Sequence, residues 1–363
     1  MKNTFGCSVA LTLFGESHGE AIGAVLDGMA PGIPLDYEFI RHQMVLRMGN
    51  PAISTARREP DEVEFVSGVL DGVTTGTPIT LLIKNTNTRS GDYKKTEALL
   101  RPGHADYTAR CKYHGFSDPR GGGHFSGRIT AGLVAAGAIA ITALERLGIH
   151  IGTHIASCAG IRDRAFSDLD TDVAYLNRAA LAVLDNEQAE RINAAILEAA
   201  KEGDSVGGIL ETAVTGLPEG VGEPWFDTVE GVLSHALFSI PAVKGVEFGD
   251  GFALADMRGS EANDPFTVEN GRIVTTTNRA GGILGGITSG MPLIVRTAIK
   301  PTPSIYRAQS TVDAEAMQDA TLEIKGRHDP AIVHRARVVA DSVIALALCD
   351  LLALRYGTDY LRG

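Results

Sequence analysis

Cysteine is scarce in this sequence, and its spacing excludes the common cysteine-based sites. The four cysteines, Cys7, Cys111, Cys158 and Cys349, form no CxxC pair. A chain of 363 residues also needs no disulfide bond to hold its core. We therefore expect a reduced, cytoplasmic protein without a cysteine metal site. The N-terminus lacks a basic region followed by an apolar stretch, so we predict no signal peptide.

Long hydrophobic runs and excess positive charge are also missing. The longest uncharged apolar run, 129–144, is rich in alanine and too short to cross a membrane, so it predicts a buried helix. The formal net charge of −11 argues against binding to nucleic acid or to an anionic membrane. The glycine run before this helix has no Gly-Lys-(Ser/Thr), and no Gly-x-Gly-x-x-Gly follows a predicted strand. Both absences disfavour the common nucleotide-binding folds.

The rest of the composition is ordinary for a globular protein. Apolar residues make up 44% of the chain and charged residues 21%, and the length suits one large domain or two smaller ones. Because predicted strands and helices do not alternate strictly, we expect a layered α/β sandwich. Strands are expected at 5–14, 21–26, 63–69, 79–83, 151–156 and 207–216. Helices are expected from Asp36 to Arg47, at 128–147, 228–239 and 330–356, and twice within 168–201, with a break near 185–186.

Two segments far apart in the sequence share one turn pattern. Residues 72–79 read Gly-Val-Thr-Thr-Gly-Thr-Pro-Ile, and residues 286–293 read Gly-Ile-Thr-Ser-Gly-Met-Pro-Leu. Each precedes an apolar strand that ends in a lysine, Lys84 or Lys300, and later a long helix rich in alanine and valine. We predict two related halves that pack as a single domain over residues 1–363. Chance similarity between two turns is the alternative.

Three short loops place a histidine close to a carboxylate. They are 15–19 with His18, 101–108 with His104, and 326–330 with Asp329 beside its histidine. Histidine exchanges protons near physiological pH, so these loops predict an acid–base site assembled from distant parts of the fold. A lone histidine of this kind is more often a hydrogen-bonded loop residue.

Arginines gather around the same loops. In a chain of negative net charge this indicates a small anionic ligand, because the guanidinium group matches phosphate and carboxylate. For any single arginine, a solvated surface position is the alternative. The arginines are Arg41, Arg47, Arg57, Arg58, Arg101, Arg120, Arg128 and Arg327.

Glycine-rich segments suggest where a cofactor binds. Residues 120–128 place three glycines, His124 and Ser126 directly before a predicted helix, where backbone N–H groups face an anion. A second glycine-dense segment, 278–290, suits close approach to a flat ligand. With the Lys300-Pro-Thr-Pro-Ser304 segment, these features predict a pocket for a phosphate-bearing cofactor. Tight turns without a ligand are the alternative.

A metal centre is the main alternative explanation of the histidines. Candidate ligands are Glu16, His18, Glu20, His104 and Asp106. No HExxH motif or comparable two-ligand spacing on a helix is present, so we predict no metal site.

Seven motifs occur in order along the chain: Phe14-Gly-Glu-Ser-His-Gly19, Arg89-Ser-Gly-Asp-Tyr93, Arg101-Pro-Gly-His-Ala-Asp-Tyr-Thr108, Arg120-Gly-Gly-Gly123, Gly281-Gly-Ile-Leu-Gly-Gly-Ile287, Lys300-Pro-Thr302 and Gly326-Arg-His-Asp-Pro330. Taken together and in this order, they resemble the chorismate synthase family across essentially the whole chain. The resemblance implies the family's β-α-β sandwich, a homotetramer, and conversion of 5-enolpyruvylshikimate 3-phosphate to chorismate by 1,4-anti elimination with reduced FMN. The substrate implied carries a phosphate and two carboxylates.

The resemblance also implies roles for individual residues. His18 would protonate the departing phosphate, His104 would support the reduced flavin near its pyrimidine ring, and Asp329 would help to relay a proton. NADPH, the indirect reductant, is ascribed to the arginine-rich segment before Thr55. No added reductase domain is visible, so we expect an external flavin reductase. The substrate-binding residues implied are Arg47, Arg41, Arg128 and Arg335. The FMN-binding residues implied are His124, Phe125, Ser126, Ala242, Gly286, Lys300, Pro301, Thr302, Pro303, Ser304 and Arg327.

The chain departs from the commonest family pattern at the flavin loop. His124 and Phe125 replace an arginine and a serine, and Pro241 stands where asparagine is common. Two other functions therefore stay open beside the flavin-dependent lyase. One is a phosphohydrolase that works without flavin, and the other is a flavoprotein that binds FMN but has lost catalysis.

Overall fold

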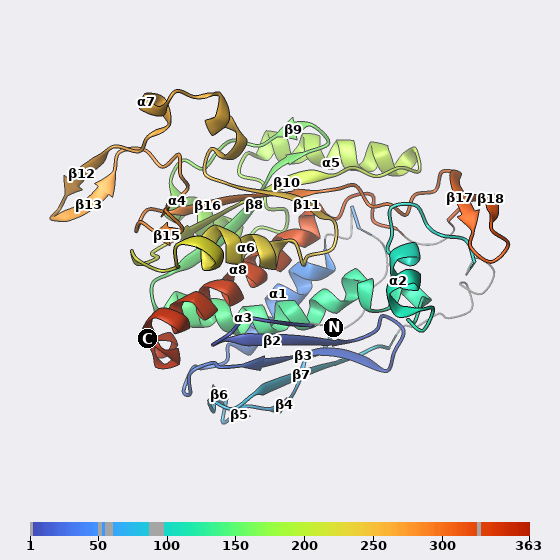
Figure 1. Cartoon of the computed structure of the whole chain (residues 1–363), viewed down its shortest axis with the longest axis horizontal. Helices are drawn as coiled ribbons and strands as arrows, with labels where there is room; N and C mark the ends of the chain where they lie inside the picture. The colour runs from blue at the N-terminus through green and yellow to red at the C-terminus, as the bar shows by residue number, and fades with distance from the viewer. Residues whose placement is uncertain (1–2, 50–52, 55–60, 87–97, 325–327) are drawn as a thin grey trace.

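The computed structural model describes residues 3–49, 53–54, 61–86, 98–324 and 328–363. Two five-stranded antiparallel sheets enclose a layer of helices, as the layered sandwich prediction requires (Figure 1). In spatial order, the first sheet contains β1 (Thr4–Phe5), β2 (Ala10–Gly15), β3 (Ala21–Asp27), β7 (Ile79–Lys84) and β4 (Glu64–Ser67). The second contains β11 (Val243–Phe248), β16 (Leu293–Ile299), β10 (Gly208–Thr215), β8 (His150–Cys158) and β9 (Ile161–Arg162).

Helices fill the space between the sheets and cover the outer face of the second one (Figure 1). The central layer holds α1 (Tyr37–Met48), α3 (Thr130–Arg146), α6 (Val229–Leu237) and α8 (Val333–Tyr356). The outer helices are α4 (Leu169–Leu176) and α5 (Asn186–Lys201). The short helices are α2 (Asp106–Tyr113) and α7 (Gly259–Ala262). Four hairpins lie outside the two large sheets: β5–β6 (Val69–Leu70, Val73–Thr74), β12–β13 (Phe266–Glu269, Arg272–Thr275), β14–β15 (Ile283–Leu284, Ile287–Thr288) and β17–β18 (Gln309–Asp313, Gln318–Leu322).

Helices α3 and α8 pack against each other at the centre of the core. Every residue of α8 from Ala336 to Ala353 is buried, and each buried Val, Leu or Ile side chain contributes about 1.5–3 kcal/mol over an exposed one. A Cβ on Gly137 of α3 would lie 2.2 Å from the Cβ of Ser342, so glycine is what permits this close approach. Among the described residues, one helix is apolar and long enough to span a membrane, Gly127–Arg146, and 83% of its apolar window is buried inside the protein. The prediction of a buried helix is confirmed.

The predicted relation between the two halves is confirmed by their topology. The order β2-β3-β7-β4 corresponds to β8-β10-β16-β11, and in each half a short hairpin precedes β7 or β16 and a long helix follows later. The hairpins are anchored alike: Thr74 Oγ1 donates to the carbonyl of Ala30, and Thr288 Oγ1 donates to the carbonyl of Pro218, both at 2.6 Å. Similar sequence patterns therefore build the same local structure twice.

The predicted strand 5–14 is wrong in one respect, because it is interrupted between β1 and β2. Gly6 has φ +94°, and the chain turns there around a carboxylate from the far end of the protein. Asp350 of α8 accepts hydrogen bonds from the backbone N–H groups of Cys7, Ser8 and Val9 at 2.7–3.1 Å. Burial of Asp350 requires these donors, and the sequence pattern of alternating residues did not reveal them.

Helix boundaries agree more closely with the sequence. The Asp36 side chain accepts from Phe39 N at 2.9 Å and begins α1, as predicted. The break between α4 and α5 is wider than expected, since residues 177–185 are not helical and Asp185 caps α5. The last long helix starts at Val333, three residues after Pro330.

Candidate active site

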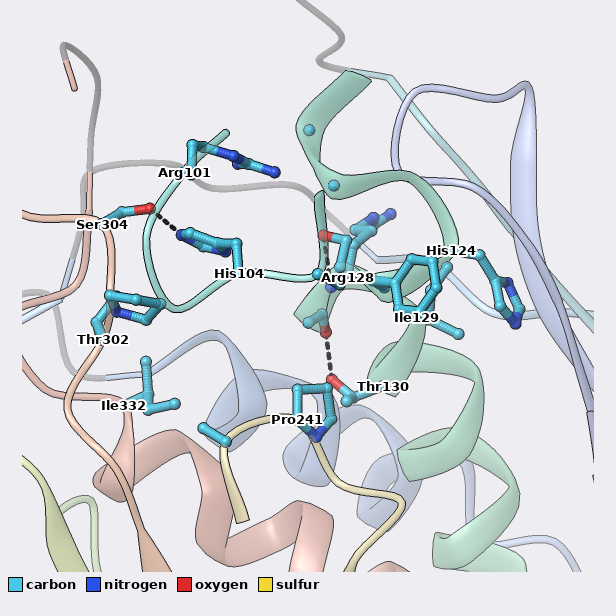
Figure 2. A pocket seen from close by; sticks show the side chains of 18 of the residues that line it. Arg101, His104, His124, Arg128, Ile129, Thr130, Pro241, Thr302, Ser304 and Ile332 are labelled. Atoms are coloured by element: carbon cyan, nitrogen blue, oxygen red, sulfur yellow. Dashed lines mark hydrogen bonds between the residues drawn. The ribbon is translucent and has the colours of Figure 1, made fainter. Parts of the chain in front are cut away.

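A cavity of about 1420 Å³ opens beside the N-terminal ends of α3 and α8. Single small-molecule pockets measure about 300–1,000 Å³, so this cavity has room for more than one ligand. Figure 2 shows Arg101, His104 and Ser304 on one side of it and His124 and Arg128 on the other. The cavity is therefore built from parts of both halves of the chain.

His104 lies on a loop that is closed by a single aspartate. Asp106 accepts from the backbone N and Nε of Arg101 at 2.9 and 2.8 Å through one oxygen, and from Nη2 at 2.6 Å through the other. The loop is also attached to the opposite half of the chain. His104 Nε2 lies 2.7 Å from Ser304 Oγ, and Lys300 Nζ donates to Gly103 O at 2.6 Å. These contacts fix the imidazole at the cavity wall.

The charge state of His104 follows from this setting. Burial lowers the pKa of His104 to about 4, and the positive charge of Arg101 acts in the same direction. At neutral pH the ring is therefore neutral, so it can accept a proton or donate a hydrogen bond, but it carries no positive charge of its own.

The glycine loop before α3 packs against the loop of His18. Residues Gly121, Gly122 and Gly123 all have positive φ, and Ser17 N donates to Gly123 O at 3.1 Å. A Cβ on Gly121 would lie 2.3 Å from Cε1 of His18, so only glycine permits the contact. His18 is 8% exposed and lies behind Gly121, which itself lines the cavity.

Two buried arginines share one carboxylate at the cavity wall. Arg47 lies in the last turn of α1 and Arg128 precedes α3, and both side chains are less than 10% exposed. Asp61 pairs with Arg47 through one oxygen and with Arg128 through the other. Burial lowers the pKa of Arg47 to about 10, against the attraction of Asp61. Even so, this arginine stays charged at physiological pH.

Arg335 and Asp329 form a second ion pair in the same cavity. Arg335 Nη1 donates to Asp329 Oδ2, and Arg335 Nε donates to the carbonyl of Arg47 at 2.9 Å. Arg335 thus joins the start of α8 to the end of α1 and holds the Asp329 carboxylate at the cavity.

Most of the expected site residues lie together. The residues that line the cavity are His104, Asp329, Arg47, Arg128, Arg335, His124, Phe125, Ser126, Ala242, Lys300, Thr302, Pro303 and Ser304. Four others do not line the cavity. His18 lies behind Gly121, and Arg41 is exposed and paired with Glu38 on α1. Gly286 packs against Glu223 and Thr228 in the β14–β15 hairpin, and Pro301 is absent from the cavity lining. Arg327, Arg57, Arg58 and residues 89–93 lie outside the described residues.

Sequence reasoning missed several charged groups of the cavity: Asp61, Asp118, Lys244 and Glu315. Asp118 binds Arg120 through three hydrogen bonds of 2.7–3.0 Å, and its place two residues before that arginine was a usable signal. No sequence pattern identified Asp61 as a site residue, because it lies far from any histidine or glycine motif. In the part of the chain that the structure describes, no group of three or more His, Cys, Asp or Glu side chains is arranged to hold a metal ion.

Comparison with known proteins decides the family. The sequence profile described as chorismate synthase matches residues 9–353. The chain is 47% identical to the chorismate synthase of Thermococcus gammatolerans, over 96% of this chain and 97% of that protein. The chain belongs to the chorismate synthase family. The chorismate synthase of Dehalococcoides mccartyi is 46% identical over 98% of both chains.

The fold gives the same answer as the sequence. A crystal structure of chorismate synthase superimposes with a TM-score of 0.76 at 28% identity, over 98% of this chain and 94% of that one. The chain is thus an enzyme of the chorismate synthase family with the family's fold. The cavity beside α3 and α8 is its candidate active site.

Proposed function

We propose that this chain converts 5-enolpyruvylshikimate 3-phosphate to chorismate and phosphate by 1,4-anti elimination, with reduced FMN as cofactor. The observation that carries the proposal is that one cavity holds buried arginines, a neutral histidine and a glycine loop together. Arginines suit the phosphate and two carboxylates of the substrate. The cavity volume leaves room for a substrate and a cofactor side by side.

The residues on the cofactor side fit a flavin phosphate. Lys300 supplies a cation. The hydroxyl oxygen of Thr302 is buried and has no hydrogen-bond partner among the residues that the structure describes, so it can bind a ligand. The glycine loop 121–123 exposes backbone close to the cavity. Reduced FMN would supply electron density that assists the loss of phosphate. Ser304, the partner of His104, would link the cofactor side to the proton-transfer side.

The protein's own groups would then handle charge and protons. Arg47, Arg128 and Arg335 bind the substrate anions and fix the ring. His18 gives a proton to the phosphate as its C–O bond breaks, and the absence of a side chain on Gly121, which lines the cavity, leaves room for the imidazole directly behind it. Asp329, held by Arg335, helps to relay the ring proton away.

The reductant and the assembly are part of the same proposal. FMN is reduced outside the cavity by a separate flavin reductase, with NADPH as the indirect electron source, in the cytoplasm. The chain forms a homotetramer. The β12–β13 hairpin supports self-association: it projects from the body of the molecule (Figure 1) and exposes Phe266, Val268 and Ile273, which an isolated chain would leave in water.

An anaerobic assay tests the proposed function. 5-Enolpyruvylshikimate 3-phosphate is supplied with and without chemically reduced FMN, and chorismate absorbance and phosphate release are followed together. Equal amounts of both products, only with reduced FMN, are expected. Phosphate without chorismate would indicate a hydrolase, and FMN binding without either product would indicate a flavoprotein that has lost catalysis.

A further inference from the structure

The carboxylate of Asp61 is placed differently from the other acids of the cavity. Asp106 pairs with one arginine, Arg101, and Asp118 pairs with one arginine, Arg120. Asp61 pairs with two arginines, since each of its carboxylate oxygens accepts a hydrogen bond from one guanidinium group. Its side chain has no exposed surface. Asp61 is thus a bridge between two cations that come from different elements of the core.

This bridge joins the end of α1 to the turn that leads into α3. Arg47 lies in the last turn of α1, and Arg128 lies in the turn that leads into α3. Asp61 reaches both from a backbone with φ +46°, a left-handed conformation that is unfavourable for residues other than glycine. The fold therefore accepts local strain to hold the carboxylate at this point.

Each guanidinium group also has a contact with an uncharged side chain. Arg128 Nε donates to Asn85 Oδ1 at 3.1 Å, and Arg47 Nη1 lies 3.5 Å from Thr130 Oγ1. These contacts orient the planes of both groups but cancel no charge. These uncharged contacts fix the orientation of the two guanidinium groups. Asp61 is the acid that both arginines share, and it supplies the negative charge opposite them.

Among the described residues, this cluster contains more cations than carboxylates. Arg47, Arg128 and Arg335 face Asp61 and Asp329, which leaves one positive charge in excess among these five groups. The pKa of Arg47 falls because of burial and because Arg335 and Arg128 repel its charge. One further anion would complete the cluster, and all five groups line the same cavity.

We propose that Asp61 is a positioning residue that holds Arg47 and Arg128 together as one receptor for a substrate oxyanion, a carboxylate or a phosphate. The inference rests on the proposed function and adds a residue that does not itself touch the substrate. Without Asp61 the two buried guanidinium groups repel each other and move apart, so the anion meets one of them instead of both. Ground-state binding is then lost more than the rate of the chemical step.

The Asp61→Asn variant tests this with binding and kinetics measured separately. Calorimetric titration with 5-enolpyruvylshikimate 3-phosphate, without reduced flavin so that no turnover occurs, is expected to give a Kd at least about tenfold higher than that of the wild type. KM is expected to rise by a similar factor, while kcat changes by less than about threefold. Asp172→Asn is the matched control, because it breaks an Arg–Asp pair on α4 remote from the cavity. Its Kd and KM are expected to stay at the wild-type values.

A double-mutant cycle shows whether Asp61 acts through the arginines. Relative to the wild type, the double variant Arg47→Gln/Asp61→Asn lacks one charge of each sign, so the cluster keeps its net charge. The double variant can be compared with Arg47→Gln even if Asp61→Asn alone fails to fold. We expect the double variant to bind the substrate within about twofold of Arg47→Gln alone, because the receptor is already lost. Additive losses would show that Asp61 acts elsewhere and would overturn the proposal. Unchanged or tighter binding by Asp61→Asn would also overturn it, the latter by showing that Asp61 competes with the substrate anion.

Titration with inorganic phosphate separates this inference from the proposed function. If the wild type does not turn over the substrate, the proposed function fails. Weaker phosphate binding by Asp61→Asn than by the wild type would then still support an oxyanion receptor. Equal phosphate binding would reject it.

Discussion

The imidazole of His18 lies directly against the Cα of Gly121, so that a side chain at position 121 would occupy the same space as the ring. Gly121→Ala would add a Cβ 2.3 Å from Cε1 of His18 and would also disfavour the backbone at φ +60° by about 1–2 kcal/mol. We expect turnover to fall about tenfold or more, because the proposed proton donor is displaced. Steady-state assays with reduced FMN measure this.

Gly160→Ala is the control for the backbone part of that effect. Gly160 has φ +79°, but its added Cβ would meet nothing within 4 Å. This variant should lose only the stability that the backbone strain costs, and it should keep its turnover. If both variants lose turnover equally, displacement of His18 is not the cause.

Removing the histidines themselves gives a second prediction. His18→Ala and His104→Ala should each lower turnover by about tenfold or more, as expected when acid–base assistance is lost. His150→Ala, on the exposed start of β8, should have no effect on turnover. Near-normal turnover in both test variants would remove these residues from the mechanism.

The low pKa of His104 predicts how stability depends on pH. The folded protein keeps His104 neutral down to about pH 4, mainly because of burial, whereas the unfolded chain takes up this proton near pH 6.5. The unfolded state therefore binds more protons between these values, and the free energy of unfolding falls as the pH drops from about 6.5 to 4. His104→Gln should lose less thermal stability than the wild type over this range. Parallel melting curves for the two proteins would contradict the prediction.

Much of the fold and of the site could be predicted from the sequence, and the rest failed for physical reasons. Regular patterns, such as the Asp36 cap and the repeated hairpin of Thr74 and Thr288, depend on neighbouring residues and were recognisable. Interactions between residues that are far apart in the sequence could not be recognised in this way. Asp350 interrupts the first strand from 341–343 residues away, and Asp61 meets Arg128 only because α1 and α3 pack together.

The same limit applies to how far the motifs located the site. Motif residues such as His104 and Ser304 meet in the cavity, 200 positions apart in sequence. Arg41 stands six residues before Arg47 and equally resembles an anion ligand, yet it turns to solvent and binds Glu38. Sequence patterns identify which segments contribute to a site, whereas packing decides which side chains point into it.

A buried histidine outside the cavity gives the opposite pH dependence to His104. His154 of β8 lies between two carboxylates, with Nδ1 2.7 Å from Asp163 Oδ2 and Nε2 3.1 Å from Glu211 Oε2. Burial acts to lower the pKa of His154, but the hydrogen bonds to Asp163 and Glu211 outweigh it and raise the pKa above the usual value. The imidazolium form therefore stabilises the folded state.

Because the folded pKa of His154 is raised, its contribution is complete below about pH 6.5, the unfolded value, and is lost as the pH rises through the folded value. We expect the urea midpoint of the wild type to fall more between pH 6 and pH 9 than that of His154→Gln. His150→Gln, an exposed change on the same strand, should follow the wild type. Asp163 also accepts from the backbone N–H groups of Leu184 and Asp185 at 2.7 and 3.0 Å, so loss of the imidazolium should first loosen the start of α5. Hydrogen exchange at these two amides would show this, and unchanged protection at pH 9 would mean that the carboxylate holds α5 without the histidine.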